Sequence, residues 1–206
     1  MKIKTILAGV ATVAAAAFLA LGVTSITSHA EDKTFWYEDV KYIVESEGNG
    51  EDLGTVKACD VNDDAKSIHI YGMPKGENGT EYVTVGIYNS LFKNNKTIRE
   101  VIISKVETDT IRSDTFSGCK NLKRVEIWGT KIKKIEKNAF KNCTSLEELH
   151  IKSSKITKTG IAKSSFDGVG DLTVYGPSKS KAKKYAKWIV NRGGAYDADY
   201  DVWDLD

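Results

Sequence analysis

An acidic and an imidazole side chain, Glu126 and His150, occupy equivalent places in two similar segments of the chain, 24 residues apart. A carboxylate beside an imidazole can carry out general acid/base chemistry when a substrate reaches both groups. The sequence offers no nucleophile and no oxyanion donors that would converge on this pair. We therefore expect a polar pair on an open surface and predict that the protein is not an enzyme.

Two acidic segments resemble the start of a calcium-binding loop, namely residues 60–64 (DVNDD) and 197–201 (DADYD). An EF-hand loop needs Gly at its sixth position and Glu at its twelfth. The first segment has Ala65 and Tyr71 at these positions, and the second has Val202 at the sixth. We therefore predict no metal site and no cofactor.

The elements that position Glu126 and His150 are internal repeats. Phe92, Phe116 and Phe140 stand 24 residues apart, and Phe166 follows 26 residues later. The positions 6, 9 and 11 residues after the first three are all apolar: Ile98, Val101, Ile103; Leu122, Val125, Ile127; Leu146, Leu149, Ile151. This period and pattern are typical of a leucine-rich repeat, in which stacked repeats share one core and form a solenoid.

Each repeat is predicted to contain one short strand, at residues 99–103, 123–128, 147–152 and 172–175. Because side chains alternate along a strand, the apolar repeat positions point inward and their neighbours point outward. The outward side chains are the predicted partner-binding surface, with Trp128 at its centre and Ile102, Glu126, His150, Lys152, Tyr71 and Tyr175 around it.

Trp128 is central to this prediction because an exposed aromatic side chain on a sheet commonly anchors a partner. The sequence leaves an alternative open, in which Trp128 packs against His150 or against the C-terminal helix.

Three cysteines follow the first thirty residues, at positions 59, 119 and 143. Cys119 and Cys143 both lie three residues after a repeat Phe, so they should stack on neighbouring repeats. They can be buried thiols or a disulfide between repeats. Free thiols are favoured, because Asn95 and Val169 occupy the same place in the outer repeats and need only fit there.

The first thirty residues are typical of a secretory signal peptide. Lys2 and Lys4 precede an apolar stretch, and Ser28-His29-Ala30 offers small residues for cleavage. The alternative is an uncleaved membrane anchor. We expect cleavage, no membrane insertion afterwards, and a secreted protein that is extracellular or on the cell surface.

Charge and length limit the remaining possibilities. Lys2 and Lys4 are two of 30 basic residues, so the remainder has 28 basic and 28 acidic side chains. This balance gives no indication of nucleic-acid binding, which needs a basic stripe. The lysines of residues 179–187 have helical spacing and are interpreted as a solvated face. The remaining length suits a single domain, and we expect a monomer.

The predicted organisation has four parts. Residues 1–30 are the signal peptide, and residues 31–86 are a β-rich N-terminal cap with strands at 35–44, 55–61 and 67–71. Residues 87–176 hold about four leucine-rich repeats. Residues 177–206 form a C-terminal cap, with a helix at 179–191 followed by an acidic edge strand. The predicted fold class is thus an α/β solenoid, a short leucine-rich repeat with a parallel sheet between these two caps.

The segments TFSGC, AFKNC, VEIWG and LHIKS and the closing LTVYGPSKSKAKKYAKW resemble BspA-like leucine-rich repeats of bacterial secreted and surface proteins. This resemblance covers residues 35–206 and implies an extracellular solenoid used for adhesion or recognition. The sequence departs from a regular repeat where Asn would form a ladder, since Val106, Thr130 and Ser154 stand there. The expected partner is an extracellular protein or glycan. The alternative function is a structural or assembly protein of the cell envelope.

Overall fold

The computed structural model describes residues 33–49 and 51–203. Contacts divide the chain into Met1–Glu31 and Asp32–Asp206, and all described residues belong to the second unit. The predicted signal peptide lies outside the described residues. No helix within the described ranges is long and apolar enough to cross a membrane.

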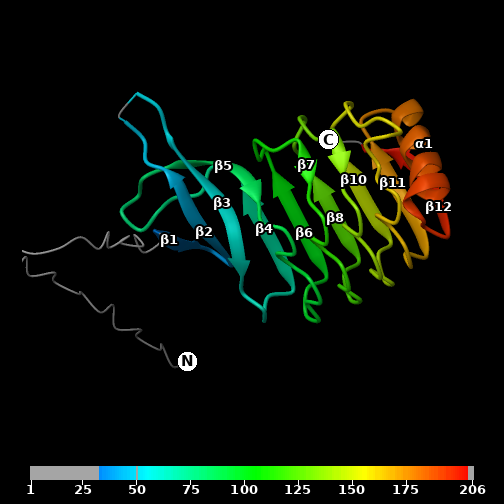
Figure 1. Cartoon of the computed structure of the whole chain (residues 1–206), viewed down its shortest axis with the longest axis horizontal. Helices are drawn as coiled ribbons and strands as arrows, with labels where there is room; N and C mark the ends of the chain where they lie inside the picture. The colour runs from blue at the N-terminus through cyan, green and yellow to red at the C-terminus, as the bar shows by residue number, and fades with distance from the viewer. Residues whose placement is uncertain (1–32, 50, 204–206) are drawn as a thin grey trace, which may run out of the picture. The chain divides into compact units, whose positions relative to one another are not determined.

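A six-stranded parallel sheet forms one side of the described unit (Figure 1). Its strands lie in the order β12, β11, β10, β8, β6, β4. Their bounds are β4 (Ser67–Tyr71), β6 (Glu100–Ser104), β8 (Arg124–Ile127), β10 (Glu148–Ile151), β11 (Asp171–Gly176) and β12 (Asp197–Val202). Val101 pairs with Val125 and Val125 with Leu149, so neighbouring repeats align at the 24-residue step that the sequence predicts.

The repeat phenylalanines form a continuous column in the core. Phe92, Phe116, Phe140 and Phe166 are at most 1% exposed. Their rings stack with successive centroid distances of 5.0, 4.9 and 4.8 Å. The apolar residues at the 6, 9 and 11 positions are equally buried. Each repeat therefore buries its apolar side chains against the repeats on either side, which explains why they recur at a fixed spacing.

The side of the stack opposite the large sheet, called the back, contains a second periodic element. Here β7 (Thr110–Ile111) pairs in parallel with β9 (Lys134–Ile135), and Ile135 forms a bridge to Ile161. Ile111, Ile135 and Ile161 are all buried. These short strands were not predicted from the sequence.

The turns after the strands differ from the expected polar ladder. Val106 is buried, whereas Thr130 and Ser154 are exposed. The polar contact comes instead from Ser153, whose hydroxyl donates to the carbonyl oxygens of Thr130 at 3.1 Å and Ile132 at 2.5 Å. The turn is therefore held by the residue before the one that the alignment indicated.

A separate four-stranded sheet lies at the N-terminal end of the described unit, in the order β1, β2, β3, β5. Its strands are β1 (Thr34–Tyr37), β2 (Val40–Ser46), β3 (Gly54–Val61) and β5 (Tyr82–Ile87). The single strand predicted at residues 35–44 is wrong. The chain turns at Glu38, which has a positive φ of 51°, and makes an antiparallel hairpin.

The region predicted as a cap also supplies one strand to the large sheet. β4 pairs in parallel with β6, with Ile68 opposite Val101 and Ile70 opposite Ile103. The statement that this region lacks the repeat register is therefore wrong for β4. Tyr42, which is buried, accepts a hydrogen bond from the Tyr71 amide at 3.0 Å and so satisfies a donor at the edge of this strand.

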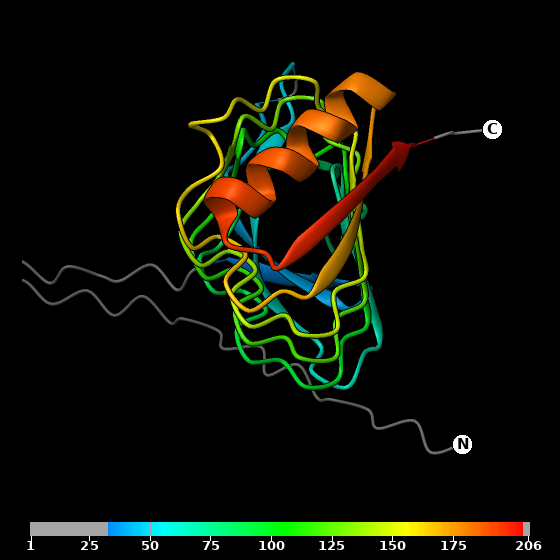
Figure 2. The same cartoon turned by 90° about the vertical axis from the view of Figure 1, so that its right-hand side faces the viewer.

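The C-terminal end is covered by α1 (Lys179–Trp188), which crosses between β11 and β12 (Figure 2). Ser178 caps the helix by accepting from the Lys181 amide at 3.4 Å. The predicted helix to residue 191 is replaced after Trp188 by a π-helical turn, Ile189–Gly193, that ends at Gly194 with a φ of 91°. The following strand, β12, forms the edge of the large sheet.

Cys119 and Cys143 are buried thiols in the structure. Their sulfur atoms donate to the carbonyl oxygens of Phe92 at 2.8 Å and Phe116 at 3.0 Å, each in the preceding repeat. Burial raises the pKa of Cys119 to about 12 and that of Cys143 further. These thiols therefore act as small core residues that bond to neighbouring backbone.

Candidate functional site

The face of the large sheet that points away from the core, called the outer face, carries the predicted partner-binding side chains. Cross-strand register sets them in columns. One central column runs through His69, Ile102, Glu126, His150 and Tyr175. Because parallel strands are about 4.8 Å apart, side chains in a column are direct neighbours.

The structure places Glu126 opposite His150, as the repeat alignment predicts. Their polar atoms nevertheless bond to other partners. Glu126 accepts from the Trp128 indole nitrogen at 2.9 Å and pairs with the Arg124 guanidinium. His150 bonds through Nε2 to Glu148 at 3.0 Å.

Both residues of the pair are also shielded from solvent. Glu126 is 6% exposed and His150 is 5% exposed. A substrate therefore has little access to either group, and their arrangement gives no support to acid/base chemistry. The described residues contain no cluster of three or more His, Cys, Asp or Glu side chains that could hold a metal ion.

Arg124 links three acidic side chains across the outer face. Its guanidinium lies 3.8 Å from Glu100 and 3.5 Å from Glu148, on the two neighbouring strands, and pairs with Glu126 on its own strand. The three carboxylates exceed the one guanidinium in charge, so the middle of the face is negative. Such a network fixes side-chain positions more than it contributes to stability.

Trp128 is half-buried, because another tryptophan packs against it. Trp203 follows β12 and meets Trp128 edge to face, with ring centroids 5.0 Å apart. It also meets His150 at 5.2 Å, while Tyr175 stacks on the other side of His150 at 4.1 Å. Trp128 thus packs mainly against a residue that neither of the sequence alternatives considered.

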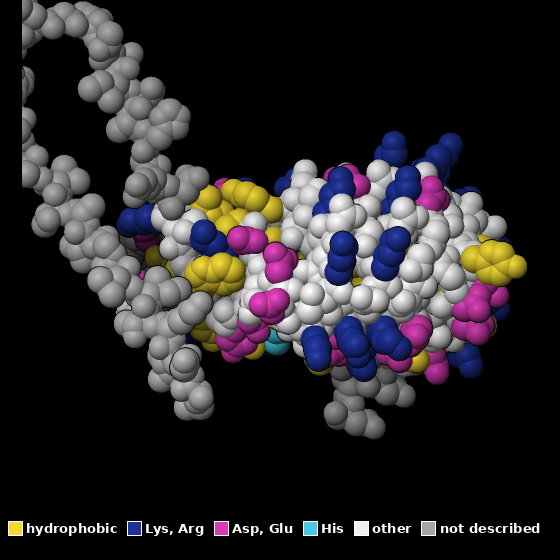
Figure 3. All heavy atoms as spheres, turned by 90° about the horizontal axis from the view of Figure 1, so that it is seen from below, with side chains coloured by type: hydrophobic (Ala, Val, Ile, Leu, Met, Phe, Trp, Pro, Cys, Tyr) yellow, Lys and Arg dark blue, Asp and Glu magenta, His cyan; other side chains and the backbone are white. Residues whose placement is uncertain are grey.

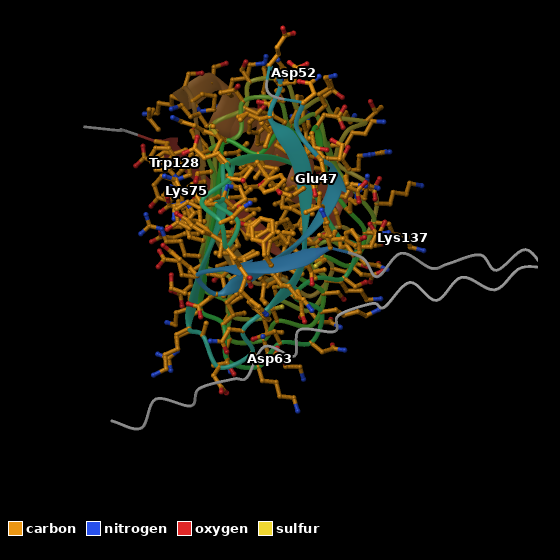
Figure 4. The ribbon with its side chains drawn as sticks, turned by 90° about the vertical axis from the view of Figure 1, so that its left-hand side faces the viewer. Glu47, Asp52, Asp63, Lys75, Trp128 and Lys137 are labelled. Atoms are coloured by element: carbon orange, nitrogen blue, oxygen red, sulfur yellow. The ribbon has the colours of Figure 1, made fainter. Side chains whose placement is uncertain are left out.

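The remaining side of Trp128 faces Lys152, whose ammonium nitrogen lies 5.4 Å from the indole centroid. A cation over an aromatic ring is held electrostatically. Figure 4 shows Trp128 from the N-terminal end, at the side of the molecule formed by the large sheet. Trp128 and Lys152 together form one half-exposed contact point on the outer face.

A hollow of about 410 Å³ or more is absent around Trp128, but a cavity of about 640 Å³ opens at the other end of the outer face. Its lining is mainly apolar and consists of His69, Tyr71, Gly72, Met73, Val83, Ser104, Lys105 and Glu107. We call it the β4–β6 hollow. It combines an apolar wall with a charged rim, as ligand and peptide sites do.

The aromatic wall of the hollow is firmly positioned. His69 stacks on Tyr71 with centroids 3.8 Å apart and bonds through Nε2 to the Ser104 hydroxyl. The Tyr71 hydroxyl donates to Glu38 at 2.9 Å, and Tyr37 packs edge-on against the Tyr71 ring. Burial lowers the pKa of His69, so its ring is neutral near pH 7.

The open side of the hollow is formed where the chain leaves β4. A Cβ at Gly72 would lie 2.6 Å from the Lys105 carbonyl oxygen, so only glycine allows the two backbones to approach this closely. Met73 then projects into solvent and is 51% exposed. A flexible, exposed methionine beside a fixed aromatic wall suits a surface that adapts to a partner.

Sequence reasoning found only Tyr71 among the residues of the hollow. Met73 and Val83 lie in a segment interpreted as loop, and no periodic pattern marks them. Trp203 was detectable, because the alternation of Asp197, Asp199 and Asp201 continues to it and predicts the same outward direction.

The two segments that resembled calcium loops do not close around a common point. Asp197, Asp199 and Asp201 are spaced along β12 at alternate positions. In the other segment, the Asn62 side chain accepts from the Asp64 amide at 3.1 Å, which makes a local turn.

Comparison with known proteins gives a family for the repeats. Residues 83–180 match the family model described as "BspA type Leucine rich repeat region", with 6 copies, where the Phe spacing indicates about four. A search of curated proteins finds no significant match.

Two solved structures are similar to this chain. One is a leucine-rich repeat protein from Bacteroides capillosus, with 19% identity and a TM-score of 0.49, covering 60% of this chain and 84% of that one. The other is a leucine-rich cell surface protein from Faecalibacterium prausnitzii, with 18% identity and a TM-score of 0.47, covering 70% of this chain and 45% of that one.

Proposed function

Because residues 83–180 belong to the BspA-type leucine-rich repeat family, we propose that this chain is a secreted or cell-surface binding module. In this proposal its outer face recognises an extracellular protein or glycan, and the protein catalyses no reaction. The stacked repeats serve as a rigid support, because each strand of the large sheet is held in register by its neighbours.

The observation that carries the proposal is the β4–β6 hollow on the outer face. It offers an apolar cavity of about 640 Å³ beside the exposed Met73 side chain. Tight protein interfaces depend on a few apolar anchors surrounded by polar contacts. The hollow can receive such an anchor, and the Arg124 network beside it can form the polar surroundings.

The absence of catalysis is supported by the state of Glu126 and His150. Each bonds to another residue and is almost fully covered. A general base must reach the proton that it removes, and neither side chain is placed to do so.

The test is a binding screen with protein produced from the full-length sequence, against immobilised extracellular proteins, glycans and envelope preparations. Met73→Ala should weaken the partner found by at least about 1 kcal/mol, as truncation of an anchor contact does. Leu53→Ala is the matched control, because Leu53 is 46% exposed and does not line the hollow. Equal losses in the two variants would contradict the proposal.

The screen also addresses the alternative of a structural or assembly protein of the envelope. Retention by envelope preparations alone, unaffected by Met73→Ala, would favour that alternative over recognition through the outer face.

A further inference from the structure

The charges of this chain are strongly segregated along its length. Residues 33–87 contain 5 Lys and Arg against 11 Asp and Glu, whereas residues 88–192 contain 23 against 10. The acidic N-terminal sheet therefore balances a strongly basic stack of repeats in the overall composition. In Figure 3, Lys and Arg side chains lie in rows across the repeats.

Part of this positive charge gathers on the back of the stack. Residues 149–166 contain Lys152, Lys155, Lys158 and Lys163 but no Asp or Glu. In the preceding repeat, Lys134 and Lys137 flank the buried Ile135. The lysines that face out from the back define the back patch: Lys134, Lys137, Lys155, Lys158 and Lys163, all exposed.

The back patch follows the repeat register. Ile135 forms a parallel bridge to Ile161, and Lys137 and Lys163 each lie two residues further along the chain. They therefore occupy equivalent places on neighbouring repeats. The bridge sets these repeats about 5 Å apart, as adjacent strands are, so the positive charges recur at short, regular steps.

The lysines of the back patch have no carboxylate partners within the part of the chain that the structure describes. Other lysines of the back do: Lys131 pairs with Glu107, and Lys133 lies 3.6 Å from Asp109. Glu136, the carboxylate nearest in sequence, accepts from the amide and hydroxyl of Ser113 at 2.9 and 3.0 Å. Unbalanced positive charges raise the local concentration of anions.

A hollow of about 450 Å³ continues the patch toward the C-terminal helix. It is lined by Lys158, Lys163, Ser164, Asp167, Asn191 and Arg192. Arg192 donates through Nε to the Ile161 carbonyl oxygen at 2.7 Å, which fixes the guanidinium at this site. Three cationic side chains thus surround the hollow against the single carboxylate of Asp167.

From this arrangement we propose that the back patch binds a linear anionic polysaccharide, such as one that carries sulfate groups. Regularly spaced lysines suit a polymer with regularly spaced charges, and the hollow beside Arg192 accepts one of its anionic groups. A nucleic acid is the less suitable polyanion, because the patch has no exposed aromatic side chain on which bases could stack. This inference does not depend on the proposed function of the outer face.

The test is binding of the full-chain product to immobilised heparin at about 0.15 M salt. The patch variant is Lys134→Gln, Lys158→Gln and Lys163→Gln combined. The control is Lys179→Gln, Lys184→Gln and Lys187→Gln, which removes the same charge from the exposed face of α1. A third variant replaces the three patch lysines by Arg and keeps the charge.

The proposal predicts at least a tenfold loss of heparin affinity in the patch variant, a loss of under threefold in the control, and retained affinity in the Arg variant. The dependence of affinity on salt should also be weaker in the patch variant, since fewer counterions are released. Equal losses in patch and control variants, or no heparin binding by the unmodified protein, would overturn the proposal. Equal affinity for a DNA duplex would overturn its assignment to a polysaccharide.

Discussion

The indole rings of Trp128 and Trp203 meet edge to face, with centroids 5.0 Å apart and planes inclined at 71°. Trp128 follows β8, near the middle of the large sheet, and Trp203 follows β12 at its edge. The C-terminal strand therefore covers part of the face that the repeats would otherwise leave open. The most accessible apolar contact point on that face moves to the β4–β6 hollow.

This ring contact should be measurable as a coupling free energy. In a double-mutant cycle with Trp128→Ala and Trp203→Ala, we expect a coupling of about 0.5 to 1.5 kcal/mol in the free energy of unfolding, as for other aromatic pairs. Denaturant titration of the four proteins provides the values. Strictly additive effects would mean that the rings do not interact in solution.

The phenylalanine column should dominate the stability of the repeats. Phe140 is fully buried between Phe116 and Phe166, so Phe140→Ala should lower the free energy of unfolding by about 3 to 5 kcal/mol. Tyr196→Ala provides the comparison, because Tyr196 is 85% exposed and should tolerate the change. A Phe140 variant that unfolds at the same denaturant concentration as the original protein would refute the repeat register.

The repeats could be predicted from the sequence because burial imposes a fixed spacing. Phe116, Leu122 and Ile127 recur as equivalents one period later, and each equivalent lies against the last. Strand positions and outward directions follow from the same spacing. The neighbouring placement of Glu126 and His150 was predictable on this basis, but their bonding partners depend on side-chain positions that spacing does not determine.

The ends of the stack were less predictable, because each end occurs once and has no period. The hairpin turn at Glu38 needs a positive φ that the sequence does not mark with glycine. Strand β4 was predicted at residues 67–71 but not its place in the large sheet, since the Phe that begins the other repeats is missing before it. The β4–β6 hollow depends on both features.

The two stacked cysteines should be unreactive in the folded protein. Burial raises the pKa of Cys119 to about 12, so the nucleophilic thiolate is scarce near pH 8. Alkylation followed by intact-mass analysis should modify Cys119 and Cys143 only after denaturant is added. A protein two hydrogens lighter, with the loss mapped to these two residues, would show a disulfide instead.

The hollow should make stability depend on pH through His69. Burial lowers its pKa in the folded state, so the unfolded chain binds the proton more readily. The stability contributed by neutral His69 is complete above the unfolded pKa of about 6.5 and is lost as the pH falls through the lower folded value. His69→Gln should therefore lose less stability than the original protein on acidification from about pH 7.5 to about pH 5. Denaturant titration at both pH values tests this, and equal losses would contradict it.

The most direct test of the central claim, that the outer face binds the partner, is a hydrogen–deuterium exchange footprint of the protein with its partner bound. We predict slower exchange in β4, β6 and the residues 72–73 that border the hollow, with unchanged exchange in β7 and β9 on the back. Protection confined to β7 and β9, with none in β4 or β6, would contradict the account.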